Sequence, residues 1–303
     1  RLTHELSPAT VAADAILLAE QPPVAGGALA LSFRPSTDAE PATLVARPPL
    51  RLINGYPHTV FLRVTCSLPR QQPITRIASA RDGDAVDLLF PLSAESAPHC
   101  QLSLGMSNGT GEVCWSAPLP LVPSGGSGGR SLERNMAQCF PRCVEADVLA
   151  TSEQAGAEAK AGREMGIQHQ LTAILALADG IPASPASALC LVVTVAPRFV
   201  LHNRTGSALL VSHMGAPGQE SLSLPNGAAH RFTGWDVRYS PGKQEATARP
   251  GPLFRVSLGE GWGWTAPIPA ARLSPARFYT AVPSRAGGNQ VLIACAASTI
   301  DGT

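Results

Sequence analysis

Two segments of the chain repeat one sequence pattern, and this internal similarity restricts the possible folds more than any other feature. Residues 48–54 and 197–203 each begin with proline, continue with mostly apolar residues and end with asparagine. Further along, a Trp-Ser/Thr-Ala-Pro segment begins at Trp115 and again at Trp264, and its separation from the asparagine is the same in both copies. Motifs that recur in the same order indicate two similar structural units in tandem.

Both copies have the pattern of β structure. Short apolar runs rich in Val, Leu, Ile and Phe are separated by clusters of Gly, Pro, Asn and Ser. This composition is typical of strands joined by turns. In residues 254–258 the apolar side chains alternate with Arg255 and Ser257. This period of two is expected when one face of a sheet is buried and the other is exposed to solvent. The pattern therefore favours a β-sandwich over alternating strands and helices.

The composition changes twice between the copies. Residues 123–130 are rich in Gly and Ser and predict a flexible loop. Residues 151–180 are rich in Ala, Glu, Gln and Lys, carry apolar residues near helical spacing and end at a Gly-Ile-Pro stop, so we expect a short helix there. A membrane-surface helix usually has a polar face rich in Lys and Arg, which this segment lacks, so a helix that packs on the protein is favoured.

The predicted fold is therefore all-β, with two tandem β-sandwich-like repeat modules and a Gly-rich loop and short helical insertion between them. The expected divisions are a first β module with a preceding strand at 1–122, the Gly-rich linker and helical insertion at 123–187, and a second β module at 188–303.

Charge and hydropathy exclude two classes of partner. The chain has 23 Lys and Arg against 22 Asp and Glu, a net charge of +1, whereas nucleic-acid binding needs a clear surplus of basic residues. The longest apolar stretches fall well short of the roughly 18 residues that a membrane span requires. Because the sequence begins at Arg1 without Met, we expect it to be part of a longer chain.

The cysteines and the glycosylation sequons point to different compartments. Seven scattered cysteines, an odd number without tight spacing, favour a reducing compartment and therefore the cytoplasm. The sequons at Asn108 and Asn203, with several tryptophans, leave a second hypothesis open, a secreted carbohydrate-binding β-sandwich protein. Glycosylation at Asn203, or six of seven cysteines paired, would favour that alternative.

Asn54 and Asn203 are the first candidate functional residues. Each follows an apolar strand and precedes a turn, and an Asn amide has two donor hydrogens and an acceptor oxygen with which to cap backbone groups on both sides. The local role expected from this chemistry is to staple the turn. A binding role would be an additional use of the loop that the asparagine orders.

Trp115 and Trp264 are candidate structural anchors, each followed by proline, Pro118 or Pro267. A large aromatic side chain buries much apolar surface, and proline tends to end or edge a strand. Core anchoring is favoured over ligand stacking, although the aromatic residues of the second copy could also form a groove for an extended or Pro-rich peptide.

Motifs for catalysis and for metal binding are weak. Cys139 and Cys143 have the spacing of two zinc ligands, but no further ligands follow at a suitable spacing. The chain also lacks the nucleophile-elbow, zinc-protease, phosphate-loop and dinucleotide-binding motifs. We therefore expect no enzyme activity, no catalytic residue, no metal and no cofactor.

The motifs of the second copy resemble the adaptor-binding region of the vacuolar protein sorting-associated protein 13 family. The shared features are the Phe-Val-Leu-His-Asn strand at 199–203, the Leu-Ser-Leu-Pro-Asn-Gly turn at 222–227 and the Trp-Thr-Ala-Pro segment that begins at Trp264. The resemblance is clearest over 192–301 and weaker over 44–121, and it does not include 123–187.

This resemblance implies a function in protein targeting. It implies that the parent is a long cytosolic rod that carries lipids between apposed membranes, and that this part holds no lipid but captures Pro-rich segments of organelle adaptor proteins. Asn54 and Asn203 match the characteristic asparagine of the family and are the implied adaptor-binding residues. The implied location is cytoplasmic, at membrane contact sites, with the membrane reached only through adaptors.

The two copies differ directly after this asparagine. The first has Gly55 and Tyr56 where the second has Arg204 and Thr205. Whether both modules or only one would bind an adaptor is therefore open.

Overall fold

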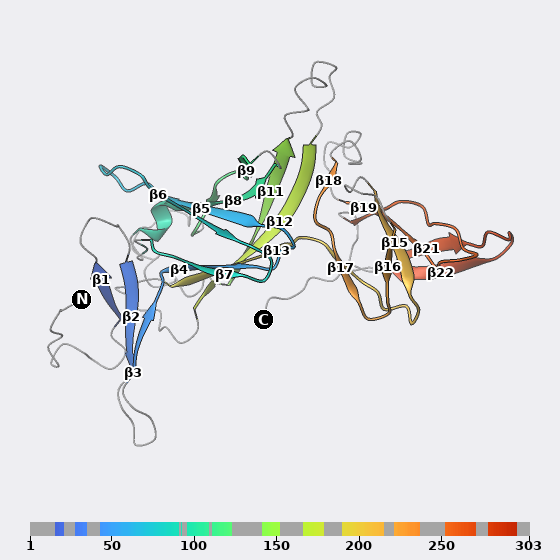
Figure 1. Cartoon of the computed structure of the whole chain (residues 1–303), viewed down its shortest axis with the longest axis horizontal. Helices are drawn as coiled ribbons and strands as arrows, with labels where there is room; N and C mark the ends of the chain where they lie inside the picture. The colour runs from blue at the N-terminus through green and yellow to red at the C-terminus, as the bar shows by residue number, and fades with distance from the viewer. Residues whose placement is uncertain are drawn as a thin grey trace, which may run out of the picture. The chain divides into compact units, whose positions relative to one another are not determined.

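The computed structural model consists of strands joined by turns and loops, which confirms the predicted all-β class (Figure 1). In the part of the chain that it describes, helical structure is restricted to one 3-10 turn, Ala97–His99, and the single 3-10 residue Ala270. The described residues are 16–20, 28–34, 43–90, 92, 96–108, 111–122, 141–151, 166–178, 190–214, 221–236, 252–270 and 278–295.

The chain forms two compact units, and neither is one continuous stretch of sequence. Unit 1 comprises Arg1–Gly105, Ala117–Ala146 and Ala173–Ala196, and unit 2 comprises Met106–Ser116, Asp147–Thr172 and Pro197–Thr303. Residues 188–196, which we expected in the second module, belong to unit 1 because the strand that they contain pairs there.

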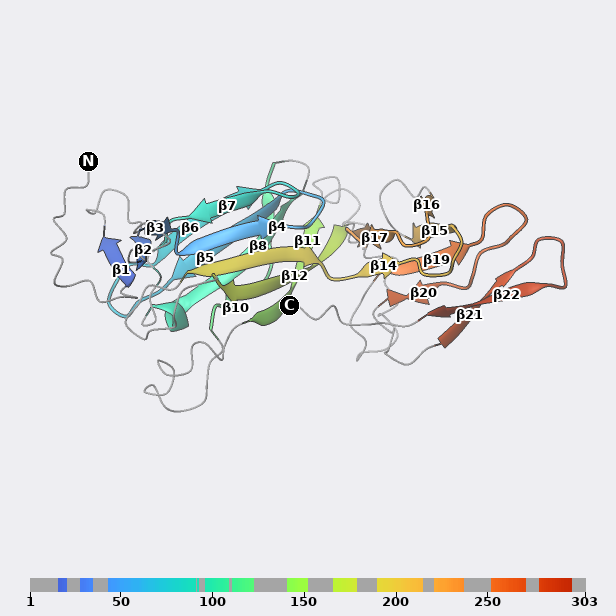
Figure 2. The same ribbon diagram turned by 90° about the horizontal axis from the view of Figure 1, so that it is seen from below.

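Residues 50–197 form two sheets, most of whose strands belong to unit 1, whereas β9, the end of β8, the last part of β11 and the first part of β12 belong to unit 2 (Figures 1 and 2). The first has the strand order β10-β8-β5-β6, with β9 also paired to β8, and the second has the order β11-β12-β13-β4-β7. Within the second, β13 runs parallel to β4, while β7 pairs with β4 in the antiparallel sense. The strands are β4 Leu50–Asn54, β5 Val60–Cys66, β6 Ile74–Ala80, β7 Ala85–Leu88, β8 Cys100–Ser107, β9 Val113–Trp115, β10 Leu119–Pro120, β11 Arg142–Thr151, β12 Gly166–Leu177 and β13 Leu191–Pro197.

The amino-terminal strands form a separate antiparallel sheet with the order β1-β2-β3. These strands are β1 Ile16–Glu20, β2 Ala28–Arg34 and β3 Thr43–Arg47.

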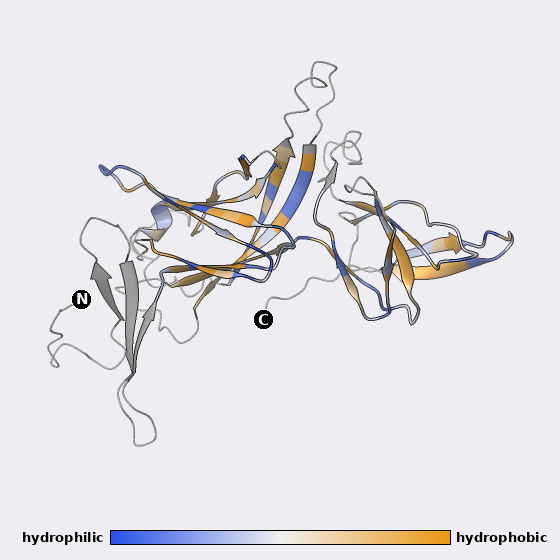
Figure 3. Ribbon diagram, in the orientation of Figure 1, coloured by the Kyte–Doolittle hydropathy of each residue, from blue (hydrophilic) through white to orange (hydrophobic). Residues whose placement is uncertain are grey.

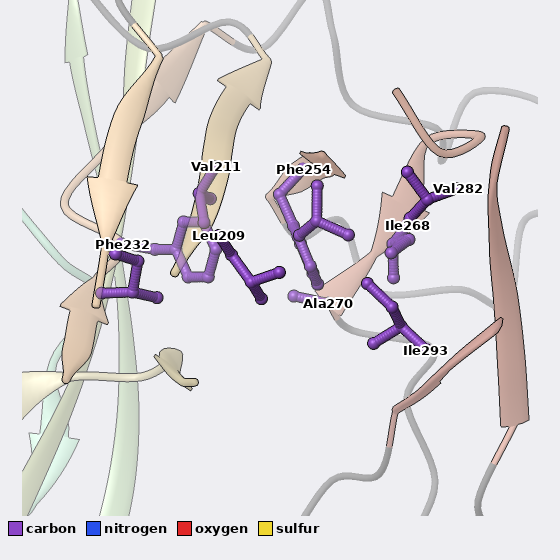
Figure 4. Close-up of a cluster of buried hydrophobic side chains, with 10 residues drawn as sticks. Leu209, Val211, Phe232, Phe254, Ile268, Ala270, Val282 and Ile293 are labelled. Atoms are coloured by element: carbon purple, nitrogen blue, oxygen red, sulfur yellow. The ribbon is translucent and has the colours of Figure 1, made fainter. Parts of the chain in front are cut away.

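Unit 2 contains one four-stranded sheet, with the order β16-β15-β19-β20, and two separate two-stranded sheets, β14-β17 and β21-β22. All three contribute to one buried hydrophobic cluster, part of which Figure 4 shows. The strands are β14 Val200–His202, β15 Leu209–Met214, β16 Leu222–Leu224, β17 Ala229–Arg231, β18 Trp235–Asp236, β19 Leu253–Ser257, β20 Ile268–Pro269, β21 Phe278–Pro283 and β22 Gln290–Cys295, of which β18 pairs with β12.

The two units share a strand order. The path β10-β8-β5-β6 in unit 1 corresponds to β20-β19-β15-β16 in unit 2, and the pair β4-β7 corresponds to β14-β17. Asn54 ends β4, and Asn203 directly follows β14. The division into two repeat modules remains a prediction, which this correspondence supports.

Alternation of side chains along the strands builds the cores. In β5 and β13 every second residue is buried, starting with the first, and β15 has the same alternation. Figure 3 shows hydrophobic residues concentrated in the strands of both units. Since successive side chains of a strand point to opposite faces, this period of two places one apolar face of each strand against the core.

The helix expected within 151–180 was a wrong prediction for the part that the structure describes. Residues 166–177 form β12, which lies between β11 and β13. In this strand Leu171, Ala173 and Leu175 are fully buried and half-buried residues alternate with them. The same apolar residues fit a helical spacing only approximately, and pairing with two neighbouring strands outweighs the helix propensity of Ala, Leu and Gln. The Gly-rich loop at 123–130 lies outside the described residues.

Candidate functional site

Asn54 holds together the turn that follows β4. Its side chain is fully buried, and Nδ2 donates hydrogen bonds to the carbonyl oxygens of His58 at 2.8 Å and Ala80 at 2.9 Å. Its Oδ1 accepts a hydrogen bond from the backbone N–H of Tyr56 at 2.8 Å. One side chain therefore ties the loop after β4 to the carboxyl end of β6.

Asn203 makes the same set of hydrogen bonds in unit 2. Its Nδ2 donates to the carbonyl oxygens of Ser207 at 2.7 Å and Leu224 at 2.8 Å, and its Oδ1 accepts from the backbone N–H of Thr205 at 3.0 Å. The Thr205 hydroxyl adds a second donor to Oδ1 at 2.8 Å. The partners lie two and four residues after the asparagine in both units, and the third is the last residue of β6 or β16. We call this arrangement the asparagine clamp.

A tight turn with glycine faces each clamp. The backbone N–H of Gly83 donates to the carbonyl of Asn54 at 2.8 Å, and that of Gly227 donates to the carbonyl of Asn203 at 2.7 Å. Both glycines have positive φ, 78° and 80°, at the third position of a four-residue turn, a conformation that glycine adopts without strain. The Arg-Asp-Gly-Asp and Pro-Asn-Gly-Ala turns thus perform the same task with different side chains.

Both amide hydrogens of each clamp asparagine are bonded inside the protein. Each Nδ2 has two hydrogens, and each donates both to carbonyl oxygens, while each Oδ1 accepts from a backbone amide. With Asn54 0% and Asn203 1% exposed, neither amide is available to a ligand. The structure thus gives both predicted site residues a role in positioning their loops.

The two clamped loops present different surfaces. In unit 1, Tyr56 is completely buried, and burial raises the pKa of its hydroxyl well above the usual range. In unit 2 the matched position is Thr205, and residues 204–207 are all exposed. The second clamp therefore supports an exposed polar loop that carries Arg204, whereas the first uses its loop to fill the core.

Trp115 and Trp264 occupy matched positions and are only half-buried. In each copy the next residue is the buried one, Ser116 at 5% and Thr265 at 3% exposed. The Thr265 hydroxyl accepts the backbone N–H of Val256 at 3.2 Å, and its own N–H donates to the carbonyl of Val256 at 2.9 Å. This hydroxyl residue is not among the predicted site residues, although its recurrence between Trp and Ala in both copies is a signal in the sequence.

The prolines of these segments, Pro118 and Pro267, are exposed and precede the short strands β10 and β20. Trp262 packs half-buried against the core of unit 2, and the adjacent Gly263 donates its N–H to the carbonyl of Pro283 at 2.7 Å. A side chain at Gly263 would place its Cβ 3.0 Å from Cγ of Pro283, so glycine allows this close approach.

Two groups of titratable side chains lie inside the units. In unit 2 the rings of His213 and His230 both contact Phe232 edge-on, and burial, with a smaller contribution from His230, lowers the pKa of His213 to about 4. In unit 1 the thiols of Cys66 and Cys100 both lie against the carbonyl oxygen of Ser96, at 3.9 and 3.1 Å.

Neither group has the composition of a metal site. Among the residues that the structure describes, no cluster of three or more His, Cys, Asp or Glu side chains could hold a metal ion. Cys139, one of the two cysteines with zinc-ligand spacing, lies outside the described residues, and Cys143 is an exposed free thiol.

Comparison with known proteins does not assign the chain to a family. No protein-family model matches it, and no curated protein matches it. The described residues include no helix of the length and hydropathy needed to cross a membrane.

Proposed function

We propose that the chain is the non-enzymatic adaptor-binding region of a vacuolar protein sorting-associated 13-like lipid transfer protein. In this role it captures Pro-rich segments of organelle adaptors at membrane contact sites, on the cytoplasmic side. The observation that supports the proposal is the asparagine clamp itself. The asparagine that the resemblance implies for adaptor binding occurs twice, buried and with the same hydrogen bonds in both units.

The second clamp is the better candidate for capture. Its loop 204–207 is exposed and is held at both ends by Asn203, whereas the first loop buries Tyr56 in its core. A Pro-rich segment has few N–H groups but keeps its carbonyl oxygens, so it needs donors from the protein. Arg204 supplies such donors, and a segment already in the polyproline II conformation loses little entropy when it docks.

The direct test is a titration of Pro-x-Pro peptides against three variants. Asn203→Ala removes the second clamp, Asn54→Ala removes the first as a matched control, and Arg204→Ala changes the exposed loop while leaving the clamp intact. We expect binding to weaken at least tenfold in Asn203→Ala and Arg204→Ala and to persist in Asn54→Ala, with circular dichroism confirming the β fold of each. Folded wild-type protein that binds none of the peptides would contradict the proposal.

The alternative, a secreted carbohydrate-binding β-sandwich, agrees less well with two features of the described residues. The cysteines at 66, 100, 114, 143, 190 and 295 are free thiols. The sequon residue Asn203 is 1% exposed, and its amide donates both hydrogens to backbone carbonyls. The amide of Asn203 is therefore not accessible for glycosylation in the folded chain. Thiol titration of the native protein separates the two hypotheses, since the secreted alternative needs paired cysteines.

A further inference from the structure

The corresponding strands β4 and β14 differ in how many neighbours they have. In unit 1, β4 lies between β7 and β13, and β13 in turn lies against β12. Among the described residues of unit 2, β14 pairs only with β17, and β21 and β22 form a separate pair. Among the described residues, no strand occupies the edge of β14 that corresponds to the β13 side of β4.

The backbone register identifies the groups on this edge. The backbone groups of Phe199 and Asn203 point toward β17. The N–H of Phe232 donates to the carbonyl oxygen of Phe199, and the N–H of Asn203 donates to the carbonyl oxygen of Ala228. Backbone groups of a strand point alternately to its two sides. By the same alternation the N–H of Arg198 points to the opposite side from β17, and it donates to the carbonyl oxygen of Gln170 in β12 at 3.2 Å. Beyond Arg198, the N–H and C=O groups of Val200 and His202, and the N–H of Arg204, point to an edge that pairs with no strand among the described residues.

The same groups are paired in unit 1. Gly55, which corresponds to Arg204, donates its N–H to the carbonyl of Val195 in β13 at 2.7 Å. Leu191 at the start of β13 donates to the carbonyl of Pro49 at 2.8 Å. The register between them pairs Leu191–Val195 with Leu50–Asn54 residue by residue.

Side-chain burial differs in the way that a missing strand would produce. Leu50 and Leu52 of β4 are 1% and 0% exposed. The corresponding Phe199 and Leu201 pack against the core of unit 2 but are only partly buried.

The two two-stranded sheets of unit 2 cover the same core. Phe232, next to β17, and Val282 and Ile293, from β21 and β22, belong to one cluster with the four-stranded sheet. Figure 4 shows Phe232 at one end of this cluster and Val282 and Ile293 at the other. In unit 1 the matching position between β4 and β12 is filled by β13.

We propose that the open edge of β14 is a strand-acceptor site for an extended segment of another polypeptide, which pairs parallel to β14 as β13 pairs with β4. The segment carries apolar residues at alternate positions, as Leu191, Val193 and Val195 do in β13, and its backbone has free N–H groups. Strand addition of this kind gains affinity from main-chain hydrogen bonds and selectivity from the alternate side chains.

This site adjoins the one in the proposed function and shares Arg204 with it, but the two bind segments of different chemistry. A strand that pairs along its length must supply N–H groups, which proline lacks. A Pro-rich segment therefore cannot form hydrogen bonds with all the backbone carbonyl groups on this edge of β14. Failure of Pro-x-Pro peptides to bind therefore leaves the strand-acceptor site unaffected, and the reverse also holds.

The test uses the full 303-residue chain and a labelled peptide with the sequence of residues 191–198 and a lysine tail. The control peptide carries V193P, which removes one N–H.

Hydrogen exchange supplies the second measurement. In the free chain we expect fast exchange at His202 and Arg204 and slow exchange at their counterparts Ile53 and Gly55, and we expect saturating peptide to slow the first pair.

A matched pair of protein variants locates the binding. His202→Pro removes an N–H from the open edge, whereas Ile53→Pro removes the corresponding N–H where β13 already pairs. We expect His202→Pro to keep the melting temperature within a few degrees and to weaken peptide binding at least tenfold. We expect Ile53→Pro to lower the melting temperature strongly.

Several results would overturn the proposal. They are absence of binding to the folded chain, binding that His202→Pro does not weaken, and slow exchange at His202 and Arg204 before peptide is added. The last result would mean that the chain already satisfies this edge itself. Self-association that His202→Pro abolishes, measured by sedimentation equilibrium, would identify a second copy as the occupant in place of a different polypeptide.

Discussion

The Nδ2 atom of Asn203 lies 2.8 Å from the carbonyl oxygen of Leu224, the last residue of β16. In unit 1 the corresponding contact joins Asn54 to Ala80 at 2.9 Å, at the end of β6. In each unit a single amide thus connects the loop between two strands to the end of a third strand. Because the group is buried, its hydrogen bonds are protected from competition with water, and its loss would leave polar backbone groups without partners.

Replacing either clamp asparagine by alanine should destabilise its unit. Asn203→Ala removes bonds to two carbonyls and one N–H, so we expect the free energy of unfolding to fall by about 2–4 kcal/mol. We expect Asn54→Ala to lower the free energy of unfolding by a similar amount. Urea denaturation measures both, and Asn226→Ala, which removes only an exposed bond to the N–H of Gly206, should cost less than about 1 kcal/mol. Equal effects of all three substitutions would show that burial of the clamp is unimportant.

The glycines that face the clamps should tolerate substitution in the order Gly, Asn, Ala. Gly227 and Gly83 have φ near 80°, and a Cβ at either position would meet no atom within 4 Å. The cost of Ala is therefore backbone strain alone, about 1–2 kcal/mol, and Asn, which enters this region more easily, should cost less. Thermal unfolding of Gly227→Ala and Gly227→Asn measures the difference. A larger loss for Asn than for Ala would contradict the strain argument.

The stability of unit 2 should decrease in mild acid. Burial, and secondarily the charge of His230, lowers the pKa of His213 to about 4 from 6.5. The unfolded chain therefore binds a proton between these values that the folded chain does not, so stability is full above pH 6.5 and falls as the pH drops toward 4. Since one pKa unit corresponds to about 1.4 kcal/mol, the loss should reach about 3 kcal/mol. Denaturation of wild type and His213→Phe at pH 7 and pH 4.5 tests this.

The His213→Phe variant should show a much shallower dependence on pH over this window. His99→Gln, a substitution of an exposed histidine, should leave the dependence as in wild type. An unchanged slope in His213→Phe would assign the acid sensitivity to other groups.

The thiols should react with alkylating reagents in an order set by burial. Cys143 is exposed, while Cys66 and Cys100 are buried, at 2% and 0% exposure. We expect iodoacetamide to modify Cys143 in the native protein and to modify the other two only after unfolding, as read by peptide mass spectrometry. Rapid native labelling of Cys100 would contradict its burial.

Alkaline pH should also weaken unit 1. Burial, and then the neighbouring Cys66 thiol, raises the pKa of Cys100 above its ordinary value of 9.0, against an opposing contribution from Ser96. Above pH 9 the unfolded chain loses this proton while the folded chain keeps it, so stability falls as the pH rises. Cys100→Ala should reduce this decline, which denaturation at pH 7.5 and pH 10 would measure.

The secondary structure of residues 166–177 was predicted least well from the sequence, because the apolar residues of this segment have an ambiguous periodicity. Over 166–177 the apolar residues fit a period of two and, roughly, a helical period. Residues 166–177 form a strand and not a helix because they pair with β11 and β13. The positions of these neighbouring strands cannot be deduced from the segment itself. The sequence also gave no reason to expect β13 in unit 1, because its parallel partner β4 lies more than a hundred residues earlier in the chain.

The sequence by itself determined the all-β class, the alternation that buries one face of strands such as β5, and the capacity of Asn54 and Asn203 to staple turns. These properties follow from side-chain chemistry and short-range spacing. Only the tertiary structure decided that both asparagines are buried with both amide hydrogens bonded, that Tyr56 fills a core where Thr205 is exposed, and that β14 has no counterpart of β13 beside it among the described residues. Burial and strand pairing depend on contacts between residues far apart in the chain, which local patterns do not specify.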